Sequence, residues 1–325
     1  KTYTLNHPKT KMLNEDIHNI DFKNELKEIG YNSIDILCGG PPCQGFSTVG
    51  SKNKKDKRNS LFWEFLRAVN ETNPRIVIFE NVSGFKSLYN GQAYETLIKE
   101  LESIGYKVFS DVLNAADYGL PQLRKRTFVI GILKEYSFAF PRIINSKNKN
   151  LFEDKYLTIM SAISDLPKLS SGEEKKNYFC KPKNNYQEKM RGNSKLLTEH
   201  NCSNYGARMQ KIISLVPPKG DVSDLPINLR PKSYFNNVYA RIDPSKPSPT
   251  ITRNFGTPSS SRCIHPFQNR ALSTREGARI QSFPDDFIFF GSKTSKNLQI
   301  GNAVPPILGE VIGKQIRKSL LKGKN

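Results

Sequence analysis

A cysteine in a stiff loop is the residue of this chain best suited to covalent chemistry. Cys43 follows an apolar run at residues 34–38 and the segment 39–42, which reads Gly-Gly-Pro-Pro. Consecutive prolines restrict the backbone before the thiol, and glycines let a substrate approach closely. A thiol presented in this way suits nucleophilic catalysis, although most free cysteines are packing residues. The loop alone leaves both interpretations of Cys43 open.

The charge balance predicts a polyanionic partner. The 325 residues include 50 lysines and arginines against 30 acidic residues, which gives a formal charge of +20. Such an excess is typical of proteins that bind phosphate backbones. No apolar run approaches the roughly 18 residues that span a bilayer, and no lipidation signal is visible. We therefore expect a cytoplasmic protein with no membrane partner.

The cysteines and histidines form no pattern of metal ligands. Five cysteines and four histidines are dispersed along the chain, without a C-x-x-C pair. Neither a zinc site nor a disulfide framework is expected, and we assign no metal ligand. Apart from Cys43, we interpret the cysteines as packing residues: Cys38, Cys180, Cys202 and Cys263.

Strand-like and helix-like segments alternate over the first ~135 residues and position the Cys43 loop. The run at 34–38 is expected to be a buried strand that delivers the loop to the carboxyl edge of a sheet. Further along, helices are predicted at 61–69 and 94–104, and strands at 76–79, 107–113 and 127–133. This rhythm predicts an α/β fold with a doubly wound, Rossmann-like sheet.

The chain changes character after about residue 138. Lysine- and asparagine-rich runs, and then prolines and serines, separate shorter apolar patches. We expect three parts: 1–164 in the sheet domain, 165–272 as a smaller irregular domain, and 273–325 returning to the first domain. A final amphipathic helix is predicted at 307–321.

Five short segments occur in an order that resembles the C5-cytosine DNA methyltransferase family. Each is weakly diagnostic alone, but the order and spacing together are specific. The segments are Pro41-Pro42-Cys43-Gln44, Glu80-Asn81-Val82, residues 122–126, residues 275–279 with Pro284-Asp285, and residues 301–305.

The resemblance implies roles for four catalytic residues. Attack of a thiolate on carbon 6 of cytosine turns the ring into an enamine that accepts a methyl group at carbon 5. Cys43 is the expected nucleophile, and Glu80 is expected to bind the N3 and N4 edge as charge develops. Arg126 is assigned to the cytosine O2, and Arg124 to a backbone phosphate and the loop around Cys43. A permanent positive charge nearby would also favour the thiolate.

The methyl donor implied by the family is S-adenosylmethionine. The acid at Asp16 matches the residue that accepts the adenine amino group, and the neighbouring aliphatic side chain packs on the ring. A proline lines the passage between donor and cytosine, and the loop at 301–305 resembles the element near the methionine end. The expected donor contacts are Asp16, Ile17, Pro41, Leu61, Asn302 and Ala303.

One part of the family pattern is absent from this sequence. The glycine loop that cradles the methionine moiety, and the acid that binds the ribose, have no counterpart within this sequence. We expect roughly forty to fifty residues upstream, which could be truncated or supplied by a separate polypeptide. The chain alone is accordingly expected to be inactive.

The expected substrate is double-stranded DNA with the target cytosine flipped out of the stack. The loop at 45–58 is expected to close on phosphates, and the irregular domain 165–272 to read the sequence through arginines bound to base edges. Candidate loop contacts are Gln44, Ser47, Lys52, Lys54, Lys55 and Arg58. Candidate contacts in the irregular domain are Arg230, Arg241, Arg253 and Arg262.

The leading hypothesis is therefore a DNA cytosine-5 methyltransferase, the modification half of a restriction–modification pair. A cognate restriction endonuclease would then act on the same site. A tRNA cytosine-5 methyltransferase is the second hypothesis. The third is an inactive DNA-binding subunit that needs a partner to supply the donor loop.

Overall fold

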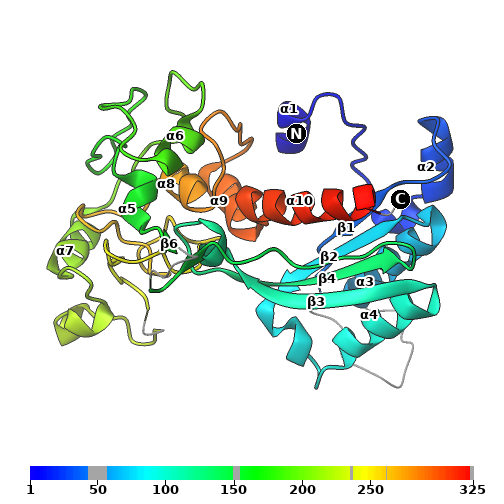
Figure 1. The fold of residues 1–325 in the computed structure, drawn as a ribbon. Coiled ribbons are helices and arrows are strands. Elements are labelled where there is room, and N and C mark those ends of the chain that lie inside the picture. Colours follow the sequence, from blue (N-terminus) through cyan, green and yellow to red (C-terminus); the bar gives the residue numbers. More distant parts are fainter. Residues whose placement is uncertain (43–56, 149–153, 235–236, 261, 323–325) are drawn as a thin grey trace. The chain divides into compact units, whose positions relative to one another are not determined.

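A four-stranded mixed sheet organises the first half of the chain in the computed structural model (Figure 1). The structure describes residues 1–42, 57–148, 154–234, 237–260 and 262–322, without the side chains of 57–60 and 322. The strands are β1 (Ile36–Gly39), β2 (Ile76–Val82), β3 (Tyr106–Asn114) and β4 (Lys125–Leu133), in the spatial order β1-β2-β4-β3. The α/β class is thus confirmed.

The sheet is parallel on one side only. β1 pairs with β2 in parallel, whereas β4 runs antiparallel to both β2 and β3. β3 and β4 are joined by a short connection that contains η3 (Ala115–Tyr118), and no helix crosses between them. Without a crossover helix the returning strand must run in the opposite direction. The sheet is therefore mixed rather than wholly parallel.

Helices α3 (Lys57–Thr72) and α4 (Gln92–Ser103) cover one face of this sheet (Figure 1). The predicted helices at 61–69 and 94–104 are confirmed with longer or shifted ends. Their apolar faces recur at helical spacing and pack against the strands. The resulting core includes Phe62, Phe65, Phe79, Leu97 and Val129, all at most 5% exposed.

The first strand is less buried than expected. β1 lies at the edge of the sheet, and Ile36 is 41% exposed. Cys38 is exposed too, so its interpretation as a packing residue is wrong. Alternate side chains of a strand share one face of the sheet, and on β1 the face that carries Ile36 and Cys38 is the exposed one. Of the other free cysteines, Cys202 and Cys263 are buried and Cys180 is half-buried.

The chain divides into two compact units that interleave along the sequence. Unit 1 comprises 1–10, 115–124 and 143–310, and unit 2 comprises 11–114, 125–142 and 311–325. Unit 2 holds the four-stranded sheet. Residues 143–164 and 273–310 fall in unit 1 together with the irregular region, and the expected division into 1–164, 165–272 and 273–325 stays a prediction.

Unit 1 is built from short helices and long connections. Its helices include α1 (Thr2–Asn6), α5 (Ile159–Ile163), α6 (Asn185–Arg191), α7 (Ala207–Leu215), α8 (Thr274–Ile280) and α9 (Lys293–Asn302). Short 3-10 turns η4 (Val222–Asp224) and η5 (Ile227–Leu229) follow α7, and β5 (Asn145–Ser146) pairs with β6 (Asp154–Lys155). Among the described residues of 165–272 no strand forms, in keeping with the irregular domain expected there.

The last helix, α10 (Pro306–Lys322), confirms the amphipathic helix predicted at 307–321. Its buried side chains Leu308, Ile312 and Ile316 recur at every fourth residue, which is the spacing of one helical face. In the part of the chain that the structure describes, no helix combines the length and apolar character needed to cross a membrane.

Candidate active site

The loop that leads to Cys43 leaves the sheet directly beside Glu80. β1 ends at Gly39, which pairs with Phe79 on the parallel strand β2, so Gly40 passes the next residue of β2. A Cβ atom at Gly40 would lie 3.0 Å from Oε2 of Glu80 and 3.3 Å from its backbone oxygen. Glycine is therefore needed at position 40 for the backbone to pass this carboxylate.

Gly39 serves a different purpose at the same strand end. A Cβ atom there would lie 2.8 Å from the ring of Phe65, which belongs to α3. The missing side chain lets α3 pack against the end of β1. The two glycines thus place the start of the Cys43 loop between a helix and a carboxylate.

Glu80 and Arg126 form an ion pair across the antiparallel strands β2 and β4. Nε of Arg126 lies 2.9 Å from Oε1 of Glu80, and the two side chains are 14% and 17% exposed, in the order Arg126 and Glu80. Burial lowers the pKa of Arg126, and the charge and hydrogen bond of Glu80 partly oppose this shift. Both groups remain accessible from one side. The sheet therefore holds an acid and a guanidinium where the Cys43 loop begins, and the catalytic roles expected for these two residues stay predictions.

Asn81 fixes the backbone of the same loop. Its Nδ2 donates to the carbonyl oxygen of Pro41 at 3.0 Å, and its Oδ1 accepts from the amide of Val82 at 2.9 Å. The second bond orients the amide so that its NH2 group faces Pro41. The sequence alone assigned no role to Asn81, and this bond gives it one in positioning.

Three expected donor contacts lie on neighbouring segments of unit 2. Asp16 caps η1 (Ile17–Asn19), where its Oδ1 accepts from the amide of His18 at 3.1 Å. Arg67 of α3 donates to the carbonyl oxygens of Ile17 at 2.7 Å and of Ile20 at 2.9 Å, which fastens η1 to this helix. Leu61 is a half-buried residue near the start of α3.

Two further donor candidates belong to unit 1. Asn302 ends α9 and is exposed, while Ala303 is half-buried. The preceding Gly301 is enclosed: a Cβ atom there would lie 2.5 Å from the backbone nitrogen of Arg253. The remaining candidate, Pro41, is half-buried in unit 2.

Arg124 has a structural role that differs from the expected one. It is fully buried in unit 1 and donates to the carbonyl oxygens of Ile251 at 3.0 Å, Gly301 at 2.8 Å and Ala303 at 2.9 Å. Its expected contacts with a DNA phosphate and with the loop around Cys43 stay predictions, because residues 43–56 lie outside the described part of the chain. In the described residues Arg124 stabilises the loop that carries two expected donor contacts.

Several predicted site residues lie outside the described residues. They are Cys43, Gln44, Ser47, Lys52, Lys54 and Lys55; Arg58 lies in the first turn of α3, and its side chain is not described.

Arg241 is not available for reading DNA. It is 4% exposed and donates to the carbonyl oxygens of Ile213, Val216 and His265 at 3.0, 3.2 and 2.9 Å. Its expected base contact is wrong, because its donors hold the end of α7 against the turn near residue 265. Burial lowers the pKa of Arg241.

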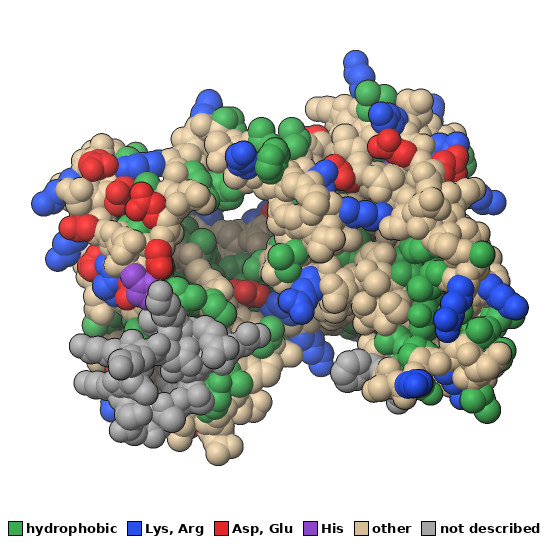
Figure 2. Space-filling view, turned by 180° about the vertical axis from the view of Figure 1, so that it is seen from behind, with side chains coloured by type: hydrophobic (Ala, Val, Ile, Leu, Met, Phe, Trp, Pro, Cys, Tyr) green, Lys and Arg blue, Asp and Glu red, His purple; other side chains and the backbone are tan. Residues whose placement is uncertain are grey.

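The other three arginines that were predicted to contact bases differ in their solvent exposure. Arg230 donates to the carbonyl oxygens of Leu225 at 2.8 Å and Ser223 at 2.7 Å, which closes the turn around η5. Arg253 is exposed, and Arg262 is partly exposed with Asp221 at 4.0 Å. In Figure 2 the part of the molecule at the lower right shows Lys and Arg among hydrophobic side chains, without acidic ones in view.

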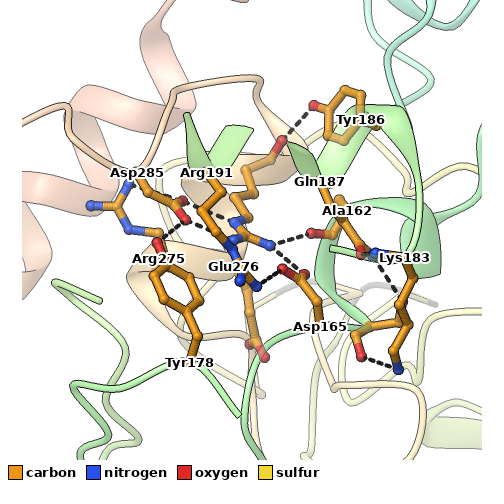
Figure 3. Close-up of polar contacts among 12 residues, drawn as sticks. Ala162, Asp165, Tyr178, Lys183, Tyr186, Gln187, Arg191, Arg275, Glu276 and Asp285 are labelled. Carbon is orange, nitrogen blue, oxygen red and sulfur yellow. Dashed lines mark hydrogen bonds and ion pairs between the residues drawn. The ribbon is translucent and has the colours of Figure 1, made fainter. Parts of the chain in front are cut away.

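A buried ionic cluster holds α8 in place (Figure 3). Arg279 donates to Asp165 at 2.5 Å and to Asp285 at 2.6 and 2.9 Å, and all three side chains are 0% exposed. Burial would raise the pKa of Asp285, but the hydrogen bonds and charge of Arg279 outweigh it and lower this pKa. Arg191 also binds Asp165, at 2.6 Å. Sequence reasoning missed Asp165 and Arg191, which lie far along the chain from the segment that contains Arg279.

Comparisons with known proteins agree with this arrangement. The family described as C-5 cytosine-specific DNA methylase matches residues 1–318. The chain is 36% identical to Type II methyltransferase M.DdeI of Desulfomicrobium norvegicum, over 97% of this chain and 80% of that protein. It is also 36% identical to Type II methyltransferase M1.HphI of Haemophilus parahaemolyticus, over 98% of this chain and 77% of that protein.

A solved structure shares the fold. A DNA modification methyltransferase encoded within an E. coli prophage superimposes with a TM-score of 0.76 at 24% identity, covering 98% of this chain and 89% of its own. With five ordered segments, the Glu80–Arg126 pair on the sheet and a family match that spans nearly all residues, this chain belongs to the C-5 cytosine-specific DNA methylase family.

Proposed function

We propose that this chain methylates carbon 5 of cytosine in a specific duplex DNA sequence, as the modification enzyme of a restriction–modification system. The observation that carries the proposal is the Glu80–Arg126 pair, 2.9 Å apart, beside the backbone that enters the Cys43 loop. The relatives named above are Type II methyltransferases, which supports the restriction–modification setting. A cognate endonuclease cutting the same site, and a cytoplasmic location, follow from that setting.

The chemistry requires a thiolate and a proton-holding acid at one cytosine. The Cys43 sulfur forms a bond to carbon 6, and the π electrons of the 5,6 double bond shift into the ring toward N3. Glu80 stabilises the ring by sharing a proton at N3, while Arg126 holds the O2 side. After carbon 5 has gained the methyl group, a base takes the remaining proton from carbon 5, that electron pair re-forms the 5,6 double bond, and the sulfur leaves carbon 6 as a thiolate. Cys43 is thus regenerated.

The residues present fit S-adenosylmethionine in part. That donor supplies an electrophilic methyl group on its sulfonium and leaves as S-adenosylhomocysteine. Asp16 is an exposed acid next to the aliphatic Ile17 in a loop fastened to α3, which suits an adenine amino group and ring face. Leu61 adds apolar surface from that helix, and Asn302 with Ala303 would meet the methionine end.

A separate N-terminal segment would complete this half of the site. The outer edge of β1 offers unpaired backbone groups and the exposed side chain of Ile36, and we propose it as the place where such a segment adds a strand. The segment would carry the glycine loop and the ribose-binding acid that the sequence lacks.

Covalent trapping tests the proposal. The chain, with and without a family N-terminal fragment, would be incubated with donor and a 5-fluorocytosine duplex, and the adduct mapped by mass spectrometry. We expect an adduct at Cys43 in the presence of the fragment, and its loss in Cys43→Ser. An adduct that persists in Cys43→Ser, or methylation at a nitrogen of the base, would overturn the assignment.

A further inference from the structure

A polar hollow lies on unit 1 beside α7, and none of its lining residues is among those assigned to catalysis. Its volume is about 700 Å³, and it is open to solvent between the loop at 168–175, one side of α7 and the turn at 268–269. The side chains that matter below are Lys168, Lys175, Lys211, Asn269 and Glu173, and we call this site the lysine hollow.

The charge of the lysine hollow is positive. Three lysines line it against one acid, which leaves a formal charge of +2. The acid, Glu173, lies 2.5 Å from Lys175. It forms an ion pair with Lys175 and with neither of the other two lysines of the hollow. Lys168 and Lys211 are exposed, and the ion pairs of the described residues include neither. Two cations are thus left to meet an anion from solution.

The buried guanidinium of Arg241, behind the wall of the hollow, adds to the positive electrostatic potential of the lysine hollow. Arg241 donates to Oδ1 of Asn269 at 2.9 Å and to the backbone oxygen of Gln268 at 2.9 Å, and both acceptors belong to residues that line the hollow. Its described partners are carbonyl and amide oxygens rather than carboxylates, so its charge is not neutralised by an acid. A buried charge is screened less by salt than a surface charge.

The wall of the hollow is held in a fixed conformation. Because Oδ1 of Asn269 accepts from Arg241, the NH2 group of this exposed amide faces the other way. Oε1 of Gln268 accepts from the amide of Leu169 and from Nε of Arg270, each at 2.9 Å, which ties the loop at 168–175 to the turn. Donors held in place lose little entropy when a ligand binds.

We propose that the lysine hollow binds a phosphate of the DNA backbone and so positions the duplex on unit 1. This inference rests on the proposed function, which supplies the duplex. The lining is polar and contains no aromatic side chain on which a base could stack. The contact therefore contributes affinity and orientation to every sequence, and base reading falls to other residues.

The salt dependence of duplex binding tests the inference. Binding of a fluorescent 20-base-pair duplex would be titrated by anisotropy at several salt concentrations with the full chain, Lys168→Gln/Lys211→Gln and the control Lys195→Gln. Lys195 is an exposed lysine of the same unit that does not line the hollow. Removing one phosphate-binding cation flattens the slope of log K against log salt by about 1. We expect the double variant to flatten it by about 1 to 2 and the control to leave it unchanged, for every duplex sequence.

The other possible results of these titrations distinguish failure of the lysine-hollow proposal from failure of the proposed function. If the full chain binds the duplex but the double variant keeps its slope, the hollow is not a DNA contact and the proposed function stands. If the full chain binds no duplex, both proposals fail. The last measurement is the binding of inorganic phosphate, followed by NMR chemical-shift changes. Suppose that the double variant loses phosphate binding while its salt dependence of DNA binding is unchanged. The hollow would then be assigned to a free phosphate compound, and the DNA proposal would be overturned. Far-UV circular dichroism of the variants excludes loss of fold.

Discussion

Nε of Arg126 donates to Oε1 of Glu80 at 2.9 Å across the antiparallel pair β2–β4, at the strand end where the Cys43 loop begins. The guanidinium compensates the carboxylate in the absence of a base, and a cytosine would compete for the same donors and acceptors. Glu80 and Arg126 could therefore each exchange their mutual bond for a bond to the cytosine, and neither charge would be left unpaired.

Glu80→Gln keeps the size of the side chain and removes its ability to hold a proton for the ring. We expect the single-turnover rate of methyl transfer to fall by roughly 10²- to 10⁴-fold, with DNA binding retained. Asp35→Asn is the matched control, since Asp35 forms an equally short pair with Arg75, 2.9 Å, but is 66% exposed. A Glu80→Gln enzyme that turns over normally would remove Glu80 from the mechanism.

Asn81→Asp replaces the donor to Pro41 by a carboxylate that repels the carbonyl oxygen. Because the start of the Cys43 loop would shift, we expect kcat to fall on the order of 10²-fold while KM for DNA changes little. Asn24→Asp, on the exposed face of α2 (Phe22–Glu28), should leave both constants unchanged. Equal losses of stability and activity in Asn81→Asp would indicate a merely structural role.

Gly301→Ala should destabilise the loop at 301–303, because its Cβ would lie 2.5 Å from a backbone nitrogen that cannot move away easily. We expect the free energy of unfolding, measured in urea, to fall by about 1–3 kcal/mol. Gly313→Ala provides the contrast, since nothing lies within 4 Å of its Cβ and the residue is inside α10. That variant should gain about 0.5–1 kcal/mol. A neutral Gly301→Ala would contradict the close approach.

Asp285→Asn leaves Arg279 with a weakened partner in a site that is 0% exposed. Breaking a buried ion pair in this way should cost about 3–5 kcal/mol in the free energy of unfolding. Glu310→Gln breaks the pair between Glu310 and Lys189, whose side chains are 42% and 52% exposed, and should cost less than about 1 kcal/mol. Similar losses of unfolding free energy in the two variants would show that the buried cluster around Arg279 stabilises the protein no more than the exposed pair between Glu310 and Lys189.

His265 should make folding stability depend on pH in mildly acidic solution. Burial lowers the pKa of His265 to about 4, and the amide of Phe267 donates to its Nδ1 at 3.1 Å. Above pH 6.5 neither the folded nor the unfolded form is protonated at this residue. As the pH falls from 6.5 to 4, only the unfolded form takes up the proton, so stability falls by an amount on the order of 3 kcal/mol.

Urea unfolding between pH 7 and pH 4 measures this loss. His265→Gln should remove the part of the slope that belongs to His265, leaving a smaller slope of the same sign from His200, whose pKa burial also lowers. A slope that is unchanged in His265→Gln would show that other groups account for the whole loss.

The sequence predicted local elements, because each depends on neighbours along the chain. The helix at 61–69 follows from periodicity and the strand at 76–79 from a continuous apolar run. The strand extends beyond the predicted end to Val82, so Glu80 lies within it rather than directly after it. The direction of β4 was not predicted, since it depends on the absence of a crossover helix after β3.

Roles that depend on distant partners could not be predicted. Arg124 and Arg241 look like other surface arginines in the sequence, and only the carbonyl groups folded around them make them structural. In the same way Asp165 precedes Arg279 by more than a hundred residues, so no local pattern marks their bond. One feature of the sequence could indicate a buried arginine, namely a position in or beside an apolar run. Arg241, for example, follows Val238-Tyr239-Ala240.

The interleaving of the two units limits how the molecule can be divided. Each unit draws on three separate stretches of the chain, so the polypeptide passes from one to the other five times. No gene fragment with a single start and a single stop encodes either unit without part of the other. Limited proteolysis would consequently release pieces of both, and an engineer who wishes to graft a new recognition specificity must exchange a stretch inside 143–310 and keep every junction intact.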